Sequence, residues 1–106
     1  MIEVTEDTFQ EKILNSNKTV VTLFYTTYCP FVRDFKPIFK KYSQNSDDEY
    51  ALVDITDDNN PLWDKCNVAK VPTILVFKEG QEIGRRNAIP GVGLIERDMQ
   101  GLLNDI

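Results

Sequence analysis

Apolar residues are distributed along the chain in two distinct patterns. The segments Val20–Tyr25, Tyr50–Ile55 and Thr73–Phe77 are almost continuously apolar or β-branched. Such runs are typical of strands that helices cover on both faces of a sheet. In two longer segments, Phe31–Tyr42 and Ile95–Ile106, apolar residues recur every three or four positions instead. This spacing predicts two amphipathic helices.

Weaker signals predict the remaining elements. Ile2–Val4 is a short extended start, and Thr5 is the expected N-cap of a helix that runs to Leu14. A short helix is expected around Leu62, and Glu82–Asn87 is expected to pair back antiparallel as a hairpin. The predicted order is β-α-β-α-β-α-β-β-α. It indicates an α/β fold whose sheet is parallel in its first part and antiparallel at the hairpin.

The size and charge of the chain narrow its function. A length of 106 residues suits one compact domain, which we expect to span residues 1–106. The net charge is -5 and no basic stripe is present, which disfavours nucleic acid and anionic membranes as partners. The first residues lack a basic segment followed by an apolar run, so we expect a cytoplasmic protein. The oligomeric state is open, with a monomer favoured.

The content of cysteine and histidine bears on the chemistry. In a reducing compartment, two cysteines are expected to be free or redox-active rather than joined in a structural bridge. The chain has no histidine, which removes Cys–His nucleophilic pairs and most zinc sites, and we expect no metal or cofactor. The acidic loop around Asp57 lacks the glycine and terminal glutamate of a calcium loop.

One short motif, Tyr28-Cys29-Pro30-Phe31-Val32, lies where a predicted strand passes into a predicted helix. Pro30 suits the first turn of a helix, where its missing N–H costs nothing. The free N–H groups of a helix N-terminus favour a thiolate, so Cys29 is placed to act as a nucleophile.

With these residues the chain resembles the thioredoxin family over nearly its whole length. The markers are Cys29 after a buried strand and an aromatic residue, Pro37 inside the following helix, and Val71-Pro72-Thr73 before a strand. Phe77-Lys78-Glu79-Gly80 follows at family spacing, and Cys-Pro-Phe also resembles glutaredoxins, which share the fold. The resemblance implies a three-layer α/β/α sandwich with a mixed central sheet of four to five strands and about four helices.

The resemblance also implies a site. Cys29 would be the nucleophile, and Arg33, at a usually basic position, would help to hold the thiolate. In the family the proline of the Val-Pro-Thr segment is cis and faces the active cysteine, so Pro72 would position the substrate backbone. A mostly apolar rim would hold an extended peptide by backbone hydrogen bonds. Its members would be Tyr28, Pro30, Phe31, Val71, Pro72 and Ile89.

The chain departs from the family where the second half of the chemistry takes place. Val32 replaces the resolving cysteine, Leu23 aligns with a buried family aspartate, and Leu52 or Ala51 aligns with its lysine partner. Without a second thiol, a mixed disulfide must wait for an external one. We therefore expect single-cysteine thiol–disulfide exchange with protein or small-molecule thiols and disulfides, and little classical dithiol reductase activity.

Several alternatives remain open at the level of sequence. A redox-inactive module could bind peptides in the same groove, with Cys29 unused. An iron–sulfur site is disfavoured because Pro30 replaces the glycine of single-cysteine glutaredoxins. Cys66 is expected to be a small buried hydrophobe, with a regulatory thiol or a substitute resolver as minor alternatives. Arg85 and its neighbour Arg86 are interpreted as exposed strand ends rather than an anion site.

Overall fold

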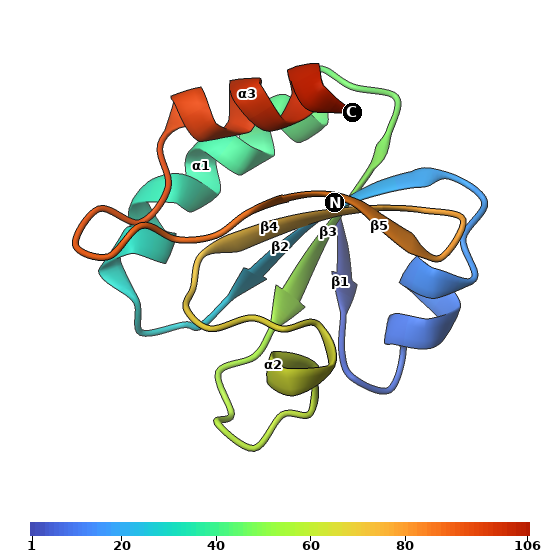
Figure 1. The fold of residues 1–106 in the computed structure, drawn as a ribbon, viewed down its shortest axis with the longest axis horizontal. Coiled ribbons are helices and arrows are strands. Elements are labelled where there is room, and N and C mark those ends of the chain that lie inside the picture. The colour runs from blue at the N-terminus through green and yellow to red at the C-terminus, as the bar shows by residue number, and fades with distance from the viewer.

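A mixed five-stranded sheet forms the middle layer of the computed structural model, which describes residues 1–106 (Figure 1). The strand order is β1-β3-β2-β4-β5. β1 and β2 both run parallel to β3, whereas β4 runs antiparallel to its two neighbours, β2 and β5. The predicted α/β fold is thereby confirmed. The strands are β1 (Ile2–Val4), β2 (Thr19–Tyr25), β3 (Glu49–Asp54), β4 (Thr73–Lys78) and β5 (Gln81–Arg86).

Helices cover both faces of the sheet, as Figure 1 shows. The two longer helices, α1 (Pro30–Gln44) and α3 (Glu96–Asp105), lie together on one face. The short helices η1 (Gln10–Leu14) and α2 (Leu62–Lys65) cover the other face. None of these helices is long and apolar enough to cross a membrane.

The side chains of β2 alternate between two separate cores. Val21, Leu23 and Tyr25 pack toward α1 and α3, whereas Val20 and Phe24 pack toward η1 and α2. Each core holds 13 buried residues, so the two helical layers have comparable apolar support. The central strand is therefore apolar on both faces because both faces are buried.

The first helix differs from the prediction. The helix η1 begins only after Phe9 and is a single widened turn, in which the Asn15 N–H donates to the Gln10 carbonyl five residues back. Thr5 does not cap it with its side chain. Instead the Thr8 hydroxyl oxygen accepts the Thr5 N–H at 3.0 Å, which holds residues 5 to 8 in a turn.

The sheet register brings two distant segments to one edge. Phe24 lies opposite Thr73 in the antiparallel pair of β2 and β4. β2 therefore ends where β4 begins, and the chain after Tyr25 emerges beside the chain before Thr73. Cys29 follows the first strand and Pro72 precedes the second. The register thus positions the two parts of the candidate site.

β5 is one edge of the sheet and is joined to β4 by a tight turn at Glu79 and Gly80. The register between the two strands shifts at Val76 and Phe77, which marks an irregularity in the ladder. The opposite edge, β1, is three residues long.

Candidate active site

Cys29 is the N-cap residue of α1. Its backbone is extended, with φ -85° and ψ 121°, and its carbonyl accepts the Arg33 N–H at 3.1 Å to start the helix. Pro30 occupies the first helical turn, and no acidic residue is present in that turn. The thiol is free and half-buried. The N-terminal end of α1, where the helix dipole is positive and the backbone N–H groups are free, therefore lies at Cys29.

The segment before β4 lies against this cysteine. The Cys29 thiol donates to the Val71 carbonyl oxygen, with Sγ and O 3.8 Å apart. The Val71–Pro72 peptide bond is cis, and Pro72 is buried. The structure thus brings Cys29 next to the Val71–Pro72 segment, which lies more than 40 residues further along the sequence.

Exposed apolar side chains are present on both sides of Cys29 in the sequence and on a distant loop. Tyr28 is 68% exposed and Phe31 37% exposed. Gly93 touches Phe31: a Cβ atom there would lie 2.6 Å from the Phe31 Cβ, and its φ of +78° also favours glycine. Ile89, which exchanges two backbone hydrogen bonds with Gly93, is 49% exposed.

The loop contributes a residue that sequence reasoning missed. Val92, beside Gly93, is 49% exposed and extends the apolar surface of the Ile89–Gly93 loop. The only sequence signal was the turn-forming Pro90-Gly91 pair after a strand, which predicts a loop but not its contact with Phe31.

The backbone of Arg33 bonds to Cys29, but the Arg33 side chain makes no hydrogen bond to the Cys29 thiol. Its side chain is 77% exposed and faces Asp34 at 3.6 Å. Arg33 and Cys29 nevertheless line the same cavity, of about 270 Å³, together with Val32 and Lys36.

The positions that correspond to the second half of the chemistry are apolar and packed together. Val32 is 4% exposed, and Leu23 and Leu52 lie directly opposite each other on β2 and β3. All three belong to the core under α1, whereas Ala51 faces the other core. Leu52 and Ala51 were the two residues that could align with the family lysine. Only Leu52 lies on the same face of the sheet as Val32 and Leu23. A buried carboxylate would lack a partner here.

Sequence comparison agrees with this geometry. The family profile described as Thioredoxin matches residues 1–96. The chain belongs to the thioredoxin family. Membership of this family indicates a role in thiol–disulfide chemistry.

Individual members of the family match along most of this thioredoxin-family chain. Thioredoxin 1 of Synechococcus elongatus is 28% identical over 81 residues, covering 76% of each chain. The thioredoxin of Mycolicibacterium smegmatis is 27% identical over 105 residues, covering 96% of this chain and 94% of its own. The crystal structure of Chlamydomonas reinhardtii thioredoxin f2 superposes with a TM-score of 0.85 at 21% identity, covering 98% and 94% of the two chains, and shares the fold.

The second cysteine of this thioredoxin-family chain lies in the other core. Cys66, the residue that ends α2, is 8% exposed and packs with Phe9 and Phe77. Burial raises the pKa of the Cys66 thiol from its ordinary value near 9 to about 11. Cys66 is a free thiol with no bond to Cys29. It is therefore protonated at neutral pH and behaves as a small hydrophobe.

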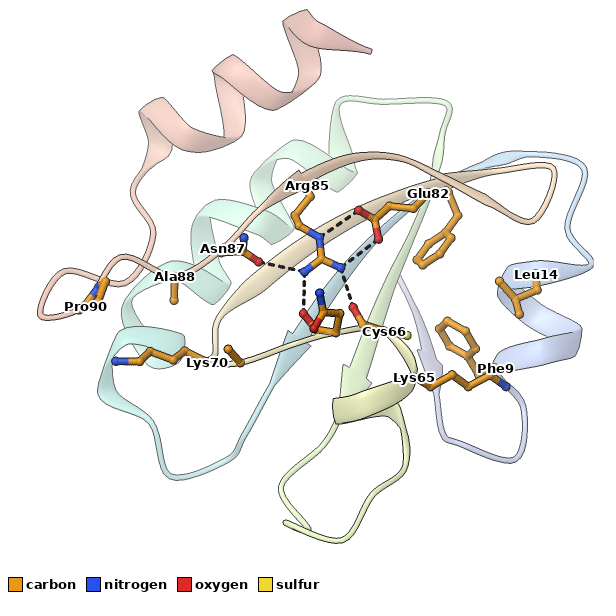
Figure 2. A pocket seen from close by; sticks show the side chains of 13 residues that line it. Phe9, Leu14, Lys65, Cys66, Lys70, Glu82, Arg85, Asn87, Ala88 and Pro90 are labelled. Atoms are coloured by element: carbon orange, nitrogen blue, oxygen red, sulfur yellow. Dashed lines mark hydrogen bonds and ion pairs between the residues drawn. The ribbon is translucent and has the colours of Figure 1, made fainter.

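The interpretation of Arg85 as an exposed strand end is wrong. Its side chain is only 20% exposed and forms a fork in the wall of the largest cavity, which measures about 770 Å³ (Figure 2). It donates to the Cys66 and Asn67 carbonyls at 2.6 and 2.9 Å and to both oxygens of Glu82. Arg85 thus caps the C-terminus of α2 and ties it to β5. Its donors are occupied, so it is not an anion site.

Proposed function

We propose that this chain performs thiol–disulfide exchange with one cysteine, Cys29, and depends on an external thiol to complete each cycle. In the first step the Cys29 thiolate attacks a client disulfide, forms a mixed disulfide and releases one client thiolate. In the second step an external thiolate attacks the mixed disulfide. Cell redox homeostasis is the process in which such chemistry belongs.

The observation that carries this proposal is the packing of Val32. It stands one helical turn after Cys29, where the family has its resolving thiol, and it is buried beside Leu23 and Leu52. The features that serve the first attack are present, namely the helix N-terminus and the adjacent cis-proline segment. The core under α1 contains neither a second thiol nor a carboxylate.

The proposed roles of the neighbouring residues follow from their positions. Pro72 and Val71 would present backbone groups to an extended client, as in other cases of peptide recognition by main-chain hydrogen bonds. Tyr28, Pro30 and Phe31 would provide the apolar contact surface, and all three are exposed. We expect this domain, residues 1–106, to act in the cytoplasm.

A trapping experiment tests the proposal. The reduced protein is mixed with a small disulfide-bonded peptide, quenched by acid and measured as an intact mass. We expect a stable one-to-one adduct that maps to Cys29 and disappears when a monothiol is added. Cys29→Ser should form no adduct, whereas Cys66→Ser should form as much as the unmodified chain. Release of fully reduced peptide without any added thiol, which requires a second thiol in the chain, or an adduct at Cys66, would contradict the proposal.

The exposed rim supports a second candidate, a redox-inactive module that binds peptides beside Pro72. Tyr28, Phe31 and Ile89 form this rim without any need for the thiol. In this case Cys29→Ser would keep its full affinity for a peptide without cysteine, measured by calorimetry, and the unmodified chain would form no adduct. Weak binding that becomes tight only through the disulfide supports the first candidate instead.

A further inference from the structure

We propose that a basic patch beside Cys29, made of Arg33, Lys36 and Lys40, binds the carboxylate of a small anionic thiol, which is the external resolver of the mixed disulfide. This inference rests on the proposed single-cysteine function and names the chemical class of its second substrate. It goes beyond the assignment of Cys29, because it places a ligand in a defined cavity.

The patch adjoins the sulfur. Cys29, Arg33 and Lys36 line the same cavity of about 270 Å³. A second hollow along α1 is lined by Arg33, Lys36 and Lys40 together with Met1 and Pro37. The two hollows share Arg33 and Lys36, so a row of basic side chains extends along α1 to Cys29.

The charge of the patch contrasts with that of the whole molecule. The chain carries -5, yet α1 contains four basic residues and one acidic residue, Asp34. Lys41 is neutralised by Glu96 on α3 at 2.7 Å. Lys36 and Lys40 are in no ion pair, and the pair of Arg33 with Asp34 is long and exposed. Exposed pairs contribute little, so positive charge remains available beside Cys29.

One residue that lines the same cavity has a buried hydroxyl without a partner. Thr26 lines the cavity with Cys29 and is fully buried, and its Oγ1 is the one buried side-chain oxygen or nitrogen without a hydrogen bond. Leaving a buried hydroxyl unpaired is unfavourable. A carboxylate, which is a strong acceptor, would satisfy it.

The size of the cavity selects a small molecule over a protein segment. Ligand pockets for drug-sized molecules are usually about 300 to 1,000 Å³, and this cavity lies just below that range. Neither Val71 nor Pro72 lines it, so it is separate from the groove proposed for the client. A thiol with one or two carboxylates can therefore reach the sulfur while the client occupies the groove.

The reaction balances with two equivalents of this thiol. The first thiolate attacks Cys29 Sγ, breaks the bond to the client sulfur and releases the client as a thiolate, which takes up a proton. The second attacks the small-molecule sulfur of the new mixed disulfide and frees the Cys29 thiolate. One client disulfide is reduced to two thiols, and two small thiols are oxidised to one small-molecule disulfide.

The test uses the mixed disulfide of Cys29 with 4-thiopyridine, whose release is followed by absorbance. The probes are 3-mercaptopropionate, mercaptosuccinate and the neutral 2-mercaptoethanol. Each rate is divided by the rate of the same thiol with a small pyridyl disulfide, which removes differences in intrinsic reactivity. We expect about a five-fold advantage for the anionic thiols at low salt that largely disappears at about 0.5 M salt, because salt screens exposed charges.

Variants locate the effect. Lys36→Gln and Lys40→Gln should each reduce the anionic advantage, and Thr26→Val should reduce it without harming folding, since it removes only an unpartnered hydroxyl. Lys12→Gln, in the layer on the opposite face of the sheet, is the matched control and should change nothing. Equal corrected rates for anionic and neutral thiols would overturn the inference while leaving the proposed function intact.

Two further outcomes are informative. If an acidic peptide thiol gains the advantage and the small anionic thiols do not, the patch serves acidic clients and the inference is wrong. If Cys29 forms no adduct with any peptide disulfide, the proposed function itself fails. The peptide trapping experiment therefore separates failure of the resolver from failure of the nucleophile.

Discussion

At the scale of single residues, the proposed single-cysteine mechanism depends on Val32. Its side chain is part of the core under α1, to which Leu23 and Leu52 also belong. A sulfur at this position would lie one helical turn from Cys29, at a spacing where side chains are neighbours. Val32 is the one position of the loop at which a family cysteine is expected to be replaced.

Val32→Cys is expected to restore internal resolution. A second thiol at this position should shorten the lifetime of the peptide mixed disulfide at least about tenfold, because an intramolecular thiol has a high effective concentration. The lifetime is measured by acid quenching and intact mass without added thiol. Val32→Ala, which opens similar space without a sulfur, should leave the lifetime unchanged. An equal effect of both substitutions would contradict the assignment of Val32.

Cys66 should make stability depend on pH in the alkaline range. Burial raises the pKa of its thiol to about 11. The unfolded chain ionises this group near pH 9, so the free energy of unfolding should be unaffected below that pH and fall between about pH 9 and 11. We expect a loss of about 1 to 2 kcal/mol over this range. Urea titrations of the unmodified chain and Cys66→Ala, compared at each pH, isolate this slope from the other titrating groups.

At the scale of elements, the strands were predictable and the first helix was not. The strands β2, β3 and β4 were found within a residue or two because each is a continuous apolar run. The Thr8 hydroxyl accepts the Thr5 N–H and holds residues 5 to 8 in a turn, so the helix starts later than predicted. The composition of this segment does not indicate that hydrogen bond. The periodicity of apolar residues indicates which positions are buried. Hydrogen bonds from side chains to the backbone can be identified only in the structure.

The candidate site likewise has residues that the sequence could predict and residues that it could not. Cys29 and Pro72 were identified from motifs at family spacing, and the structure brings them together. The role of Arg85 was missed because its partners are the carbonyls of Cys66 and Asn67, nearly 20 residues away. Backbone carbonyls leave no mark in a sequence, so no pattern of residue types could indicate this fork.

Arg85→Gln should loosen the end of α2. It removes donors to the Cys66 and Asn67 carbonyls, and we expect a loss of about 2 kcal/mol in the free energy of unfolding. Alkylation of Cys66 in the folded protein should become faster, as measured by mass spectrometry. Arg86→Gln is the matched control, because the adjacent arginine pairs with an exposed Asp105 and should cost less than about 1 kcal/mol. Similar effects of both changes would argue against a specific fork.

At the scale of the whole molecule, the sheet separates the two cysteine thiols. Cys29 packs against the core under α1 and α3, and Cys66 belongs to the core under η1 and α2. A disulfide requires Cα atoms within about 7 Å. Side chains assigned to opposite faces of one sheet do not meet this requirement without a rearrangement of the fold.

Mild oxidation should therefore produce no internal bridge. We expect diamide treatment of the folded protein to yield mixed or intermolecular disulfides at Cys29, and no monomeric species lighter by two hydrogen atoms. Intact mass under non-reducing conditions checks this result. The same treatment in urea, where the fold no longer separates the thiols, is the positive control and should generate the bridged monomer.

The two edges of the sheet bear on the behaviour of the protein at high concentration. β5 carries four polar or charged residues among its six and is joined to β4 through a shifted register, while β1 offers only three residues for pairing. Charged side chains, irregular ladders and short strands are the devices by which natural proteins discourage edge-to-edge association. The apolar sheet interior is thus flanked by edges that are poor templates for fibril growth, and a concentrated solution of the folded chain should resist aggregation through its strands.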